Sequence, residues 1–208
     1  QARALAGPAE APVVLLGHSL GGVAAPRIAA KAPGLAGLVL MATPAEPLED
    51  AILRQARYIA ELDGLDEAER AQIAELERQV ARVKSADLST ATPAMSLPLG
   101  LPPAYWLDLR GHDVAKELAQ VPLPMLFLQG GRDYQVTTRD LDAFRRALAG
   151  RTDVTFRVFP QSSHLFIAGT ATPGPGDYLV AGHVEPQVID AIAQFVRSLA
   201  PPLAATLP

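Results

Sequence analysis

The hydrophobic positions of the chain fall into two patterns, and each pattern predicts one kind of secondary structure. Short apolar runs, which are typical of strands buried in a parallel sheet, occupy residues 12–16, 38–42 and 124–129, and a further strand is predicted at 154–159. In the segments between them, apolar residues recur every three or four positions, as they do on one face of a helix. The alternation predicts an α/β fold class with a mostly parallel sheet flanked by helices.

The first apolar run stops abruptly at Gly-His-Ser-Leu-Gly, residues 17–21, and an alanine-rich helical pattern follows over residues 23–32. A strand that feeds a helix through a very tight turn holds the residue at its apex in a strained backbone conformation, with the side chain lifted off the end of the sheet. We expect Ser19 to occupy that apex, and we expect Gly17 and Gly21 to provide the space around it. The alternative is an ordinary glycine-rich turn between a strand and a helix.

A charged segment between the second and third predicted strands has helical periodicity. Apolar residues recur every three or four positions over residues 48–62 and again over 73–83, with a break between the two stretches. Asp66 and Glu69 have the spacing of a capping box, which predicts the start of the second helix. The charged residues on the other faces of both helices are interpreted as solvated surface.

These predictions divide the chain into four parts, with a helical cap insertion at residues 45–113. Residues 1–44 and 114–200 form the core of the fold, and residues 201–208 are a tail. Within the cap, residues 85–103 alternate apolar side chains with prolines and are expected to have little regular structure. Apolar residues on an irregular loop suggest a substrate-binding wall, although packing of the cap on the core explains them equally well. The candidate substrate-binding residues are His18, Met95, Leu97, Tyr105 and Trp106.

Three polar residues follow three of the predicted strands: Ser19, Asp133 and His164. The carboxyl ends of parallel strands meet at one edge of a sheet, where ligands bind in α/β folds, so these side chains are expected to approach one another. A serine hydroxyl becomes a good nucleophile when a base removes its proton, and an imidazole can do so near neutral pH. A carboxylate can hold that imidazole in the required tautomer and stabilise its cation. The pattern therefore predicts a Ser-His-Asp triad.

Each member of the predicted triad has a structural alternative. Asp133 follows Gly-Gly-Arg, and aspartate favours turns whatever its chemistry, while His164 is also compatible with a packed or surface histidine. The other histidines are His18 inside the tight turn, His112 in the connection from the cap, and His183 before the last predicted helix. We rank His164 above His183 as the base, because it directly follows the last strand, where a base must reach over the serine.

Composition argues against several classes of function. The 208 residues suit one domain, and an apolar content of 49% with a formal net charge of -4 is typical of a soluble globular protein. Lysine and arginine are scattered, without the basic stripe that favours nucleic acid. Cysteine is absent and no two histidines have the spacing of a zinc site, so no metal is expected. The sequence shows no targeting segment, so it assigns no compartment. It also shows no run of roughly 20 apolar residues, so no membrane span is predicted.

Three motifs, taken in order, carry a family resemblance: Gly-His-Ser-Leu-Gly-Gly at residues 17–22, Gly-Gly-Arg-Asp-Tyr-Gln-Val at 130–136, and Ser-Ser-His-Leu-Phe at 162–166. Together with a helical insertion between the first two motifs, they resemble a serine esterase of the α/β-hydrolase superfamily. Within that superfamily, the chain looks most like a bacterial carboxylesterase branch. The resemblance covers nearly the whole chain.

The resemblance implies that Ser19 is the nucleophile, Asp133 the acid and His164 the base, with a cap over an acyl pocket. The backbone N–H of Leu20 would then be one donor of the oxyanion hole. The implied substrate is a small-molecule ester, cleaved through an acyl-serine intermediate without a cofactor. A thioesterase, acyltransferase or peptidase on the same triad stays open as an alternative, as does a non-catalytic module that keeps the hydrolase fold.

The chain departs from the family at its front. Members of the family have several strands before the strand that precedes the serine, and a loop after one of them supplies the second backbone N–H of the oxyanion hole. We expect this donor to come from an N-terminal part of the same enzyme that lies outside this chain. Without it, the transition state would lose about 3 to 4 kcal/mol of stabilisation. The strand at residues 12–16 would also have an exposed apolar edge.

Overall fold

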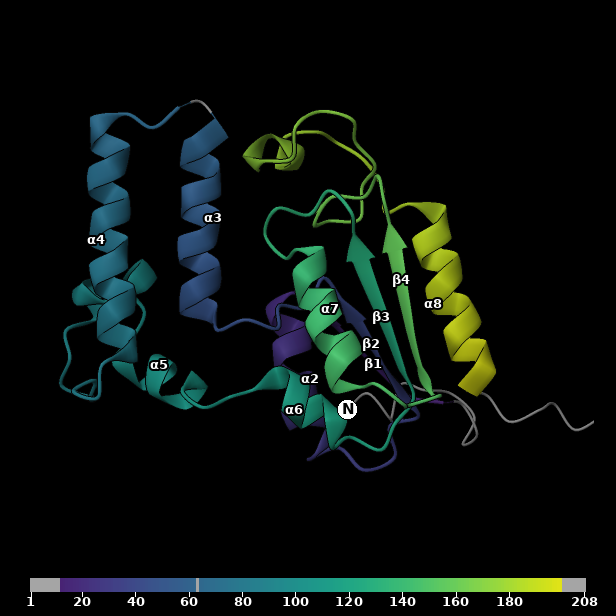
Figure 1. Ribbon diagram of the computed structural model, residues 1–208. Helices are drawn as coiled ribbons and strands as arrows, with labels where there is room; N and C mark the ends of the chain where they lie inside the picture. The colour runs from purple at the N-terminus through teal and green to yellow at the C-terminus, as the bar shows by residue number, and fades with distance from the viewer. Residues whose placement is uncertain (1–11, 63, 200–208) are drawn as a thin grey trace, which may run out of the picture.

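The computed structural model describes residues 12–62 and 64–199 (Figure 1). Its four strands form one parallel sheet in the order β1-β2-β3-β4, which is also their order in the chain. The α/β fold class with a mostly parallel sheet is therefore confirmed, and each strand begins and ends close to its predicted position. The predicted tail, residues 201–208, lies outside the described residues. The strands are β1 (Val14–His18), β2 (Gly37–Met41), β3 (Met125–Gly130) and β4 (Val154–Phe159).

Helices cover both faces of the sheet (Figure 1). One face is covered by α2 (Leu20–Ala29), α6 (Val114–Ala119) and α7 (Thr138–Ala147), and the other by α8 (Pro186–Leu199). Successive side chains of a strand point to opposite faces, so the two buried strands contribute to both cores. On the α2 side, the core includes Leu38, Leu40, Met125 and Phe127. On the α8 side, it includes Val39, Met41, Leu126 and Leu128.

The prediction that the first strand is buried on both faces is wrong. Among the described residues, β1 is an edge strand that pairs with β2 alone, and Leu16 is 48% exposed. Gly17 is the one buried residue of this strand. An apolar run indicates that a strand avoids polar side chains, but it does not say how many neighbouring strands or helices cover it.

The cap helices are set apart from the layers of the sheet (Figure 1). Helices α3 (Leu48–Leu62) and α4 (Glu67–Lys84) lie side by side, and Asp66 and Glu69 form the predicted capping box of α4. Two 3-10 turns and a short helix follow them: η1 (Ala94–Ser96), η2 (Pro98–Gly100) and α5 (Pro103–Leu109).

The cap has a hydrophobic cluster of its own. Its buried members come from α4, the irregular segment and α5: Val83, Leu88, Leu97 and Trp106. These contacts let the insertion pack on itself, and the segments on either side join it to β2 and α6. The residue boundaries of the four predicted parts stay a prediction. No helix in the described part of the chain is both long and apolar enough to cross a membrane.

Candidate active site

Ser19 occupies a sharp turn between β1 and α2. Its backbone has φ 54° and ψ -122°, and the helix begins at the next residue, Leu20. A positive φ is uncommon for a residue other than glycine and persists where surrounding contacts enforce it. One such contact is the N–H of Ser19, which donates to the carbonyl of Met41 on β2 at 2.9 Å. The turn therefore holds the strained apex that the sequence predicted.

The turn leaves no space for a side chain at Gly17 or Gly22. A Cβ atom on Gly17 would lie 2.5 Å from the carbonyl oxygen of Gly21, and one on Gly22 would lie 1.9 Å from Thr43 Oγ1. A Cβ atom on Gly21 would meet no described atom within 4 Å. The expectation that an absent side chain at Gly21 provides space is therefore wrong. It is the backbone of Gly21 that matters, because it passes close to Gly17.

Asp133 and His164, which follow β3 and β4, meet in a buried hydrogen bond. His164 Nδ1 lies 2.7 Å from Asp133 Oδ2, and each residue is only 6% exposed. The other carboxylate oxygen, Asp133 Oδ1, accepts the backbone N–H groups of Gln135 and Val136 at 2.8 and 2.9 Å. Because Nδ1 donates to the carboxylate, a neutral His164 has its free lone pair on Nε2.

The segment after β4 holds His164 in a compact turn. The N–H of Ser163 donates to the carbonyl of Ile167, and the N–H of Phe166 donates to the carbonyl of Ser163, both at 3.0 Å. Phe166 has φ 57°, is fully buried and packs edge-on against Phe159 of β4. A buried side chain on a residue with a left-handed backbone indicates that its surroundings fix this turn.

His18, the residue before Ser19, connects the serine turn to His164. His18 Nε2 donates to the backbone carbonyl of His164 at 2.9 Å, and the centroids of the two imidazole rings lie 4.7 Å apart. Burial lowers the pKa of His18 below its ordinary value, which favours the neutral ring, and the hydrogen bond to the carbonyl opposes part of this effect. The contacts of His18 are thus with the predicted base, and its role toward substrate stays a prediction.

These residues lie together at the carboxyl edge of the sheet, but not every neighbouring pair is joined by a hydrogen bond. His18, Asp133 and His164 form one connected cluster, and Ser19 adjoins it through its bond to His18 along the chain. Among the described residues, the Ser19 hydroxyl makes no hydrogen bond to His164. Catalytic hydrogen bonds in a substrate-free enzyme are often long and tighten when substrate binds.

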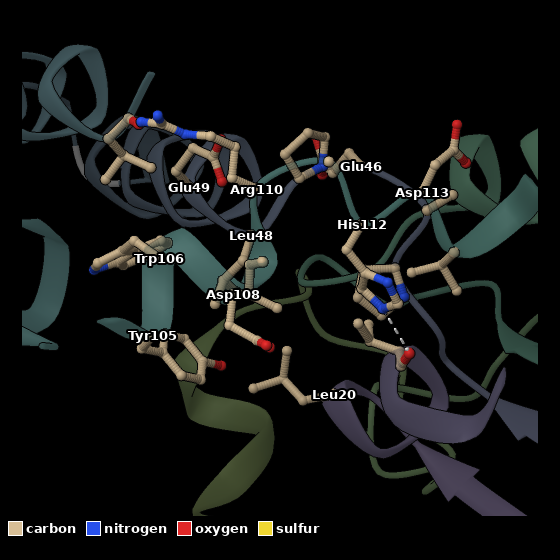
Figure 2. A pocket seen from close by; sticks show the side chains of 18 of the residues that line it. Leu20, Glu46, Leu48, Glu49, Tyr105, Trp106, Asp108, Arg110, His112 and Asp113 are labelled. Carbon is tan, nitrogen blue, oxygen red and sulfur yellow. Dashed lines mark hydrogen bonds between the residues drawn. The ribbon is translucent and has the colours of Figure 1, made fainter. Parts of the chain in front are cut away.

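A cavity of about 850 Å³ lies between the cap and the α2 side of the core (Figure 2). Leu20 lines it at the start of α2, beside the serine turn, and Tyr105 and Trp106 line it from α5 (Figure 2). The other three predicted substrate-binding residues, His18, Met95 and Leu97, are not among its lining. Met95 is 83% exposed, and Leu97 is fully buried in the hydrophobic cluster of the cap.

Within the described ranges, 12–62 and 64–199, the other two histidines, His112 and His183, make no hydrogen bond to Asp133. The imidazole of His112 is buried where the cap joins α6, and it contacts the carbonyl of Val23 through Nε2 at 3.0 Å and the carboxylate of Glu117 through Nδ1. His183 is exposed before α8. The residues that the structure describes contain no group of three or more His, Cys, Asp or Glu placed to hold a metal ion.

Two residues that were not among the predicted site residues hold the segment around Asp133. Gln129, in β3, is buried, and its amide donates to the carbonyl of Val136 at 2.8 Å and lies 3.3 Å from Asp133 Oδ2. The available signal was a polar residue at the end of an apolar run. Arg54 of α3 donates to two backbone carbonyls just after Asp133. Helical periodicity does not distinguish this arginine from exposed ones.

Solved structures with the same fold include two α/β proteins. An esterase from Pyrococcus furiosus superposes with a TM-score of 0.53 at 13% sequence identity, covering 90% of this chain and 54% of that chain. A putative hydrolase from Agrobacterium vitis superposes with a TM-score of 0.50 at 21% identity, covering 90% of this chain and 61% of that chain. At these identities the likeness concerns the fold, which is that of the α/β hydrolases.

Sequence comparison gives two further findings. The chain is 36% identical over 184 residues to esterase EstD of Thermotoga maritima. The match covers 88% of this chain and 42% of EstD, so the chain spans less than half the length of that relative. The family model described as serine aminopeptidase, S33, matches residues 2–169. That match takes in most of the chain, including the serine turn, Asp133 and His164, and the chain therefore belongs to the serine aminopeptidase S33 family of α/β hydrolases.

Proposed function

We propose that the protein hydrolyses carboxylic esters through an acyl-serine intermediate. Ser19 is the nucleophile, His164 the general base, and Asp133 the acid that orients the base. The observation that carries the proposal is the buried 2.7 Å contact between His164 Nδ1 and Asp133 Oδ2. It leaves His164 Nε2 as the free nitrogen at the edge of the sheet where Ser19 stands in its strained turn. The identity to EstD, which is named an esterase, supports ester chemistry.

The proposed reaction has two halves. In the first, Ser19 Oγ bonds to the carbonyl carbon of the ester while its proton passes to His164 Nε2. The tetrahedral intermediate then collapses, the bond to the alcohol oxygen breaks, and the proton moves from His164 to the leaving alcohol. In the second half, water attacks the acyl-serine and gives a proton to His164, which returns it to Ser19 Oγ as the carboxylic acid leaves. Water is the one co-reactant that this sequence needs.

Leu20 N–H is the proposed oxyanion donor within this chain, because it is the first amide of α2 and directly follows the serine. We propose that a segment N-terminal to β1, outside this chain, supplies the second donor and pairs with the edge of β1 that has no partner strand among the described residues. The exposure of Leu16 on that edge supports this, as does the match to less than half of EstD. Intact mass and N-terminal sequencing of the natural enzyme test it. A single species that begins at Gln1 and has no companion chain contradicts it.

We propose that the acyl group of the substrate lies in the cavity between α2 and the cap. Leu20 and Tyr105 supply exposed apolar surface there, which favours a modest acyl chain over acetate. The test is the hydrolysis rate of p-nitrophenyl esters of graded chain length. A rate that falls steadily from acetate upward would show that the cavity does not receive the acyl group.

Peptide hydrolysis is a second candidate, because the matching family is described as a serine aminopeptidase. Both reactions pass through an acyl-serine and differ in the leaving group, an alcohol in one and an amine in the other. The values of kcat/KM for a p-nitrophenyl ester and for an aminoacyl p-nitroanilide separate them. Faster turnover of the anilide would replace the esterase proposal. A folded protein that turns over neither, nor a thioester, would match the non-catalytic alternative.

Substitution of the nucleophile tests the proposal most simply. Ser19→Ala is expected to abolish ester hydrolysis. The matched control is Ser198→Ala, which removes an exposed serine on α8 whose hydroxyl donates to the carbonyl of Phe195. It is expected to hydrolyse esters at the rate of the unsubstituted protein. Ester hydrolysis that survives Ser19→Ala contradicts the proposal.

A further inference from the structure

The segment that follows Asp133 is held by hydrogen bonds and a ring contact from the first helix of the cap. Arg54 of α3 donates through Nη1 to the carbonyl of Tyr134 at 3.1 Å and through Nη2 to the carbonyl of Gln135 at 2.7 Å. Gln55 Nε2 donates to the same Gln135 carbonyl at 3.0 Å. One turn further along α3, the ring of Tyr58 stacks on the ring of Tyr134, with centroids 5.4 Å apart and planes 19° from parallel. We call residues 133–137 the acid loop.

The same loop holds the carboxylate of Asp133. The N–H of Gln135 donates to Asp133 Oδ1, while the carbonyl of Gln135 accepts from Arg54 and Gln55. The two ends of one residue's backbone thus join the cap to the acid. Any shift of α3 against the core acts on Gln135 directly, and Asp133 is the next group in the chain of hydrogen bonds. Asp133 in turn is bonded to His164.

Arg54 is itself held in place. Its Nε donates to the carboxylate of Glu46 at 2.7 Å, and the side chain is 27% exposed. Glu46 lies in the segment that leads from β2 into the cap, and its N–H reaches the buried carboxylate of Asp140 at 3.4 Å. The other oxygen of Asp140 accepts the N–H of Thr137, at the end of the acid loop, at 2.9 Å. The start of the cap and the acid loop are therefore both bonded to the side chains of Arg54 and Asp140.

The acceptors around Arg54 suit an arginine side chain better than a lysine side chain. A planar guanidinium can donate to two carbonyls and one carboxylate at once from a fixed fork, whereas a lysine ammonium is a point charge on a flexible stem. We propose that Arg54 is a positioning residue for catalysis: through the acid loop, the cap helix α3 sets the place of the Asp133 carboxylate and so the orientation of His164. This inference rests on the proposed function, in which Asp133 and His164 are the acid and the base. It makes the cap part of the catalytic apparatus in addition to a wall of the cavity.

The test compares Arg54→Met, Arg54→Lys and a matched control in the intact protein. The control is Arg57→Met, on the same helix, which removes an arginine that is half exposed and pairs with Glu77 of α4. Arg54→Met is expected to lower kcat on a p-nitrophenyl ester by about 10- to 100-fold with KM little changed, because a small displacement of a catalytic group has costs of this order. Arg54→Lys is expected to have a kcat close to that of Arg54→Met. Arg57→Met is expected to have a kcat close to that of the unsubstituted protein.

A pH profile separates positioning from a merely structural role. A displaced Asp133 stabilises the imidazolium of His164 less, so the acid limb of the kcat/KM profile of Arg54→Met is expected to move to lower pH. A loss of folded protein would lower the whole profile without moving it. Gln55→Leu removes one of the three bonds to the acid loop, and it is expected to shift kcat and the acid limb in the same direction by less. If Arg54→Met does not fold, the kcat and the pH profile of Gln55→Leu test the proposal in its place.

The outcomes keep the two proposals apart. Hydrolysis that survives Ser19→Ala contradicts the proposed function, whatever Arg54 does. If Ser19→Ala is inactive while Arg54→Met and Gln55→Leu keep the kcat and the pH profile of the unsubstituted protein, the proposed function stands and the positioning role of Arg54 is wrong. Equal losses in Arg54→Met and Arg57→Met, with unmoved profiles, would also overturn it, because the effect would then be general to α3.

Discussion

The two glycines that flank Ser19 in the motif differ sharply in the space that surrounds them, and a pair of alanine substitutions turns this difference into a measurement. In Gly17→Ala, the added Cβ atom would lie 2.5 Å from the carbonyl oxygen of Gly21, with two further backbone atoms at 2.6 and 2.7 Å. A displacement of about 0.9 Å is needed to reach an ordinary contact of 3.4 Å. All three atoms belong to the backbone of the turn, so no side chain can rotate away.

The expected cost follows from that geometry. Overpacking of a filled site costs about 1 to 3 kcal/mol of the free energy of unfolding, and here the strain falls on a turn that already holds Ser19 at a positive φ. In Gly21→Ala, the Cβ atom meets no described atom within 4 Å, and the residue lies in α2. Alanine replaces glycine in a helix with a gain of up to about 1 kcal/mol. The two variants are therefore expected to differ by about 1.5 to 4 kcal/mol.

Urea denaturation measures the difference, provided that both variants unfold with the same dependence on urea concentration. Gly17→Ala is expected to unfold at a lower urea concentration than the unsubstituted protein, and Gly21→Ala at an equal or higher one. Gly22→Ala, whose Cβ atom would lie 1.9 Å from the Thr43 hydroxyl, is expected to be destabilised as well. Equal stability of Gly17→Ala and Gly21→Ala, or a larger loss in Gly21→Ala, would refute the reasoning.

Three further predictions follow from the site and the cap. Asp133→Asn keeps the shape of the acid but favours the wrong tautomer of the base, so kcat for ester hydrolysis is expected to fall by up to about 10⁴-fold, as in serine proteases; a change of less than threefold, roughly, would remove Asp133 from the mechanism. Burial lowers the pKa of His18, which lies beside His164 and Asp133, so below about pH 6.5 the unfolded chain binds more protons there than the folded one. The contribution of His18 to stability is then full above that pH and lost as the pH falls, and urea denaturation of His18→Gln should show a shallower loss on acidification than the unsubstituted protein. Trp106→Ala removes a fully buried side chain of the cap cluster and is expected to cost about 3 to 5 kcal/mol; calorimetry that shows an unchanged transition would mean that the cluster does not stabilise the cap.

The parts of the fold that depend on local pattern could be predicted from the sequence. Three of the four strands were visible as apolar runs, the fourth was predicted at residues 154–159, and the capping box at Asp66 and Glu69 needs only its own spacing. The apolar run alone did not indicate the exposure of Leu16, because burial of a strand depends on neighbours that the run itself does not encode; only the missing N-terminal strands of the family suggested it. The need for glycine at Gly17 was predicted, but the open space around Gly21 was not, since it depends on how the backbone segments of the turn approach one another.

The candidate site divides in the same way. Ser19, Asp133 and His164 could be proposed because each follows a strand, and parallel topology brings strand ends together. Arg54 was interpreted as part of a solvated helix face, yet its partners are backbone carbonyls about 80 residues further along the chain. Backbone groups have no residue identity, so no sequence motif marks them as acceptors. The cap contacts therefore had to come from the structure.

Labelling of the intact protein with a fluorophosphonate, followed by peptide mapping, tests most directly whether Ser19 is an activated nucleophile. The reagent reacts with a serine whose hydroxyl is activated by a base. We expect an adduct on Ser19, none there in Ser19→Ala, and a strongly slowed reaction in His164→Ala. An adduct on another serine, or none in a folded sample, would contradict the claim that Ser19 is the activated nucleophile of this α/β hydrolase.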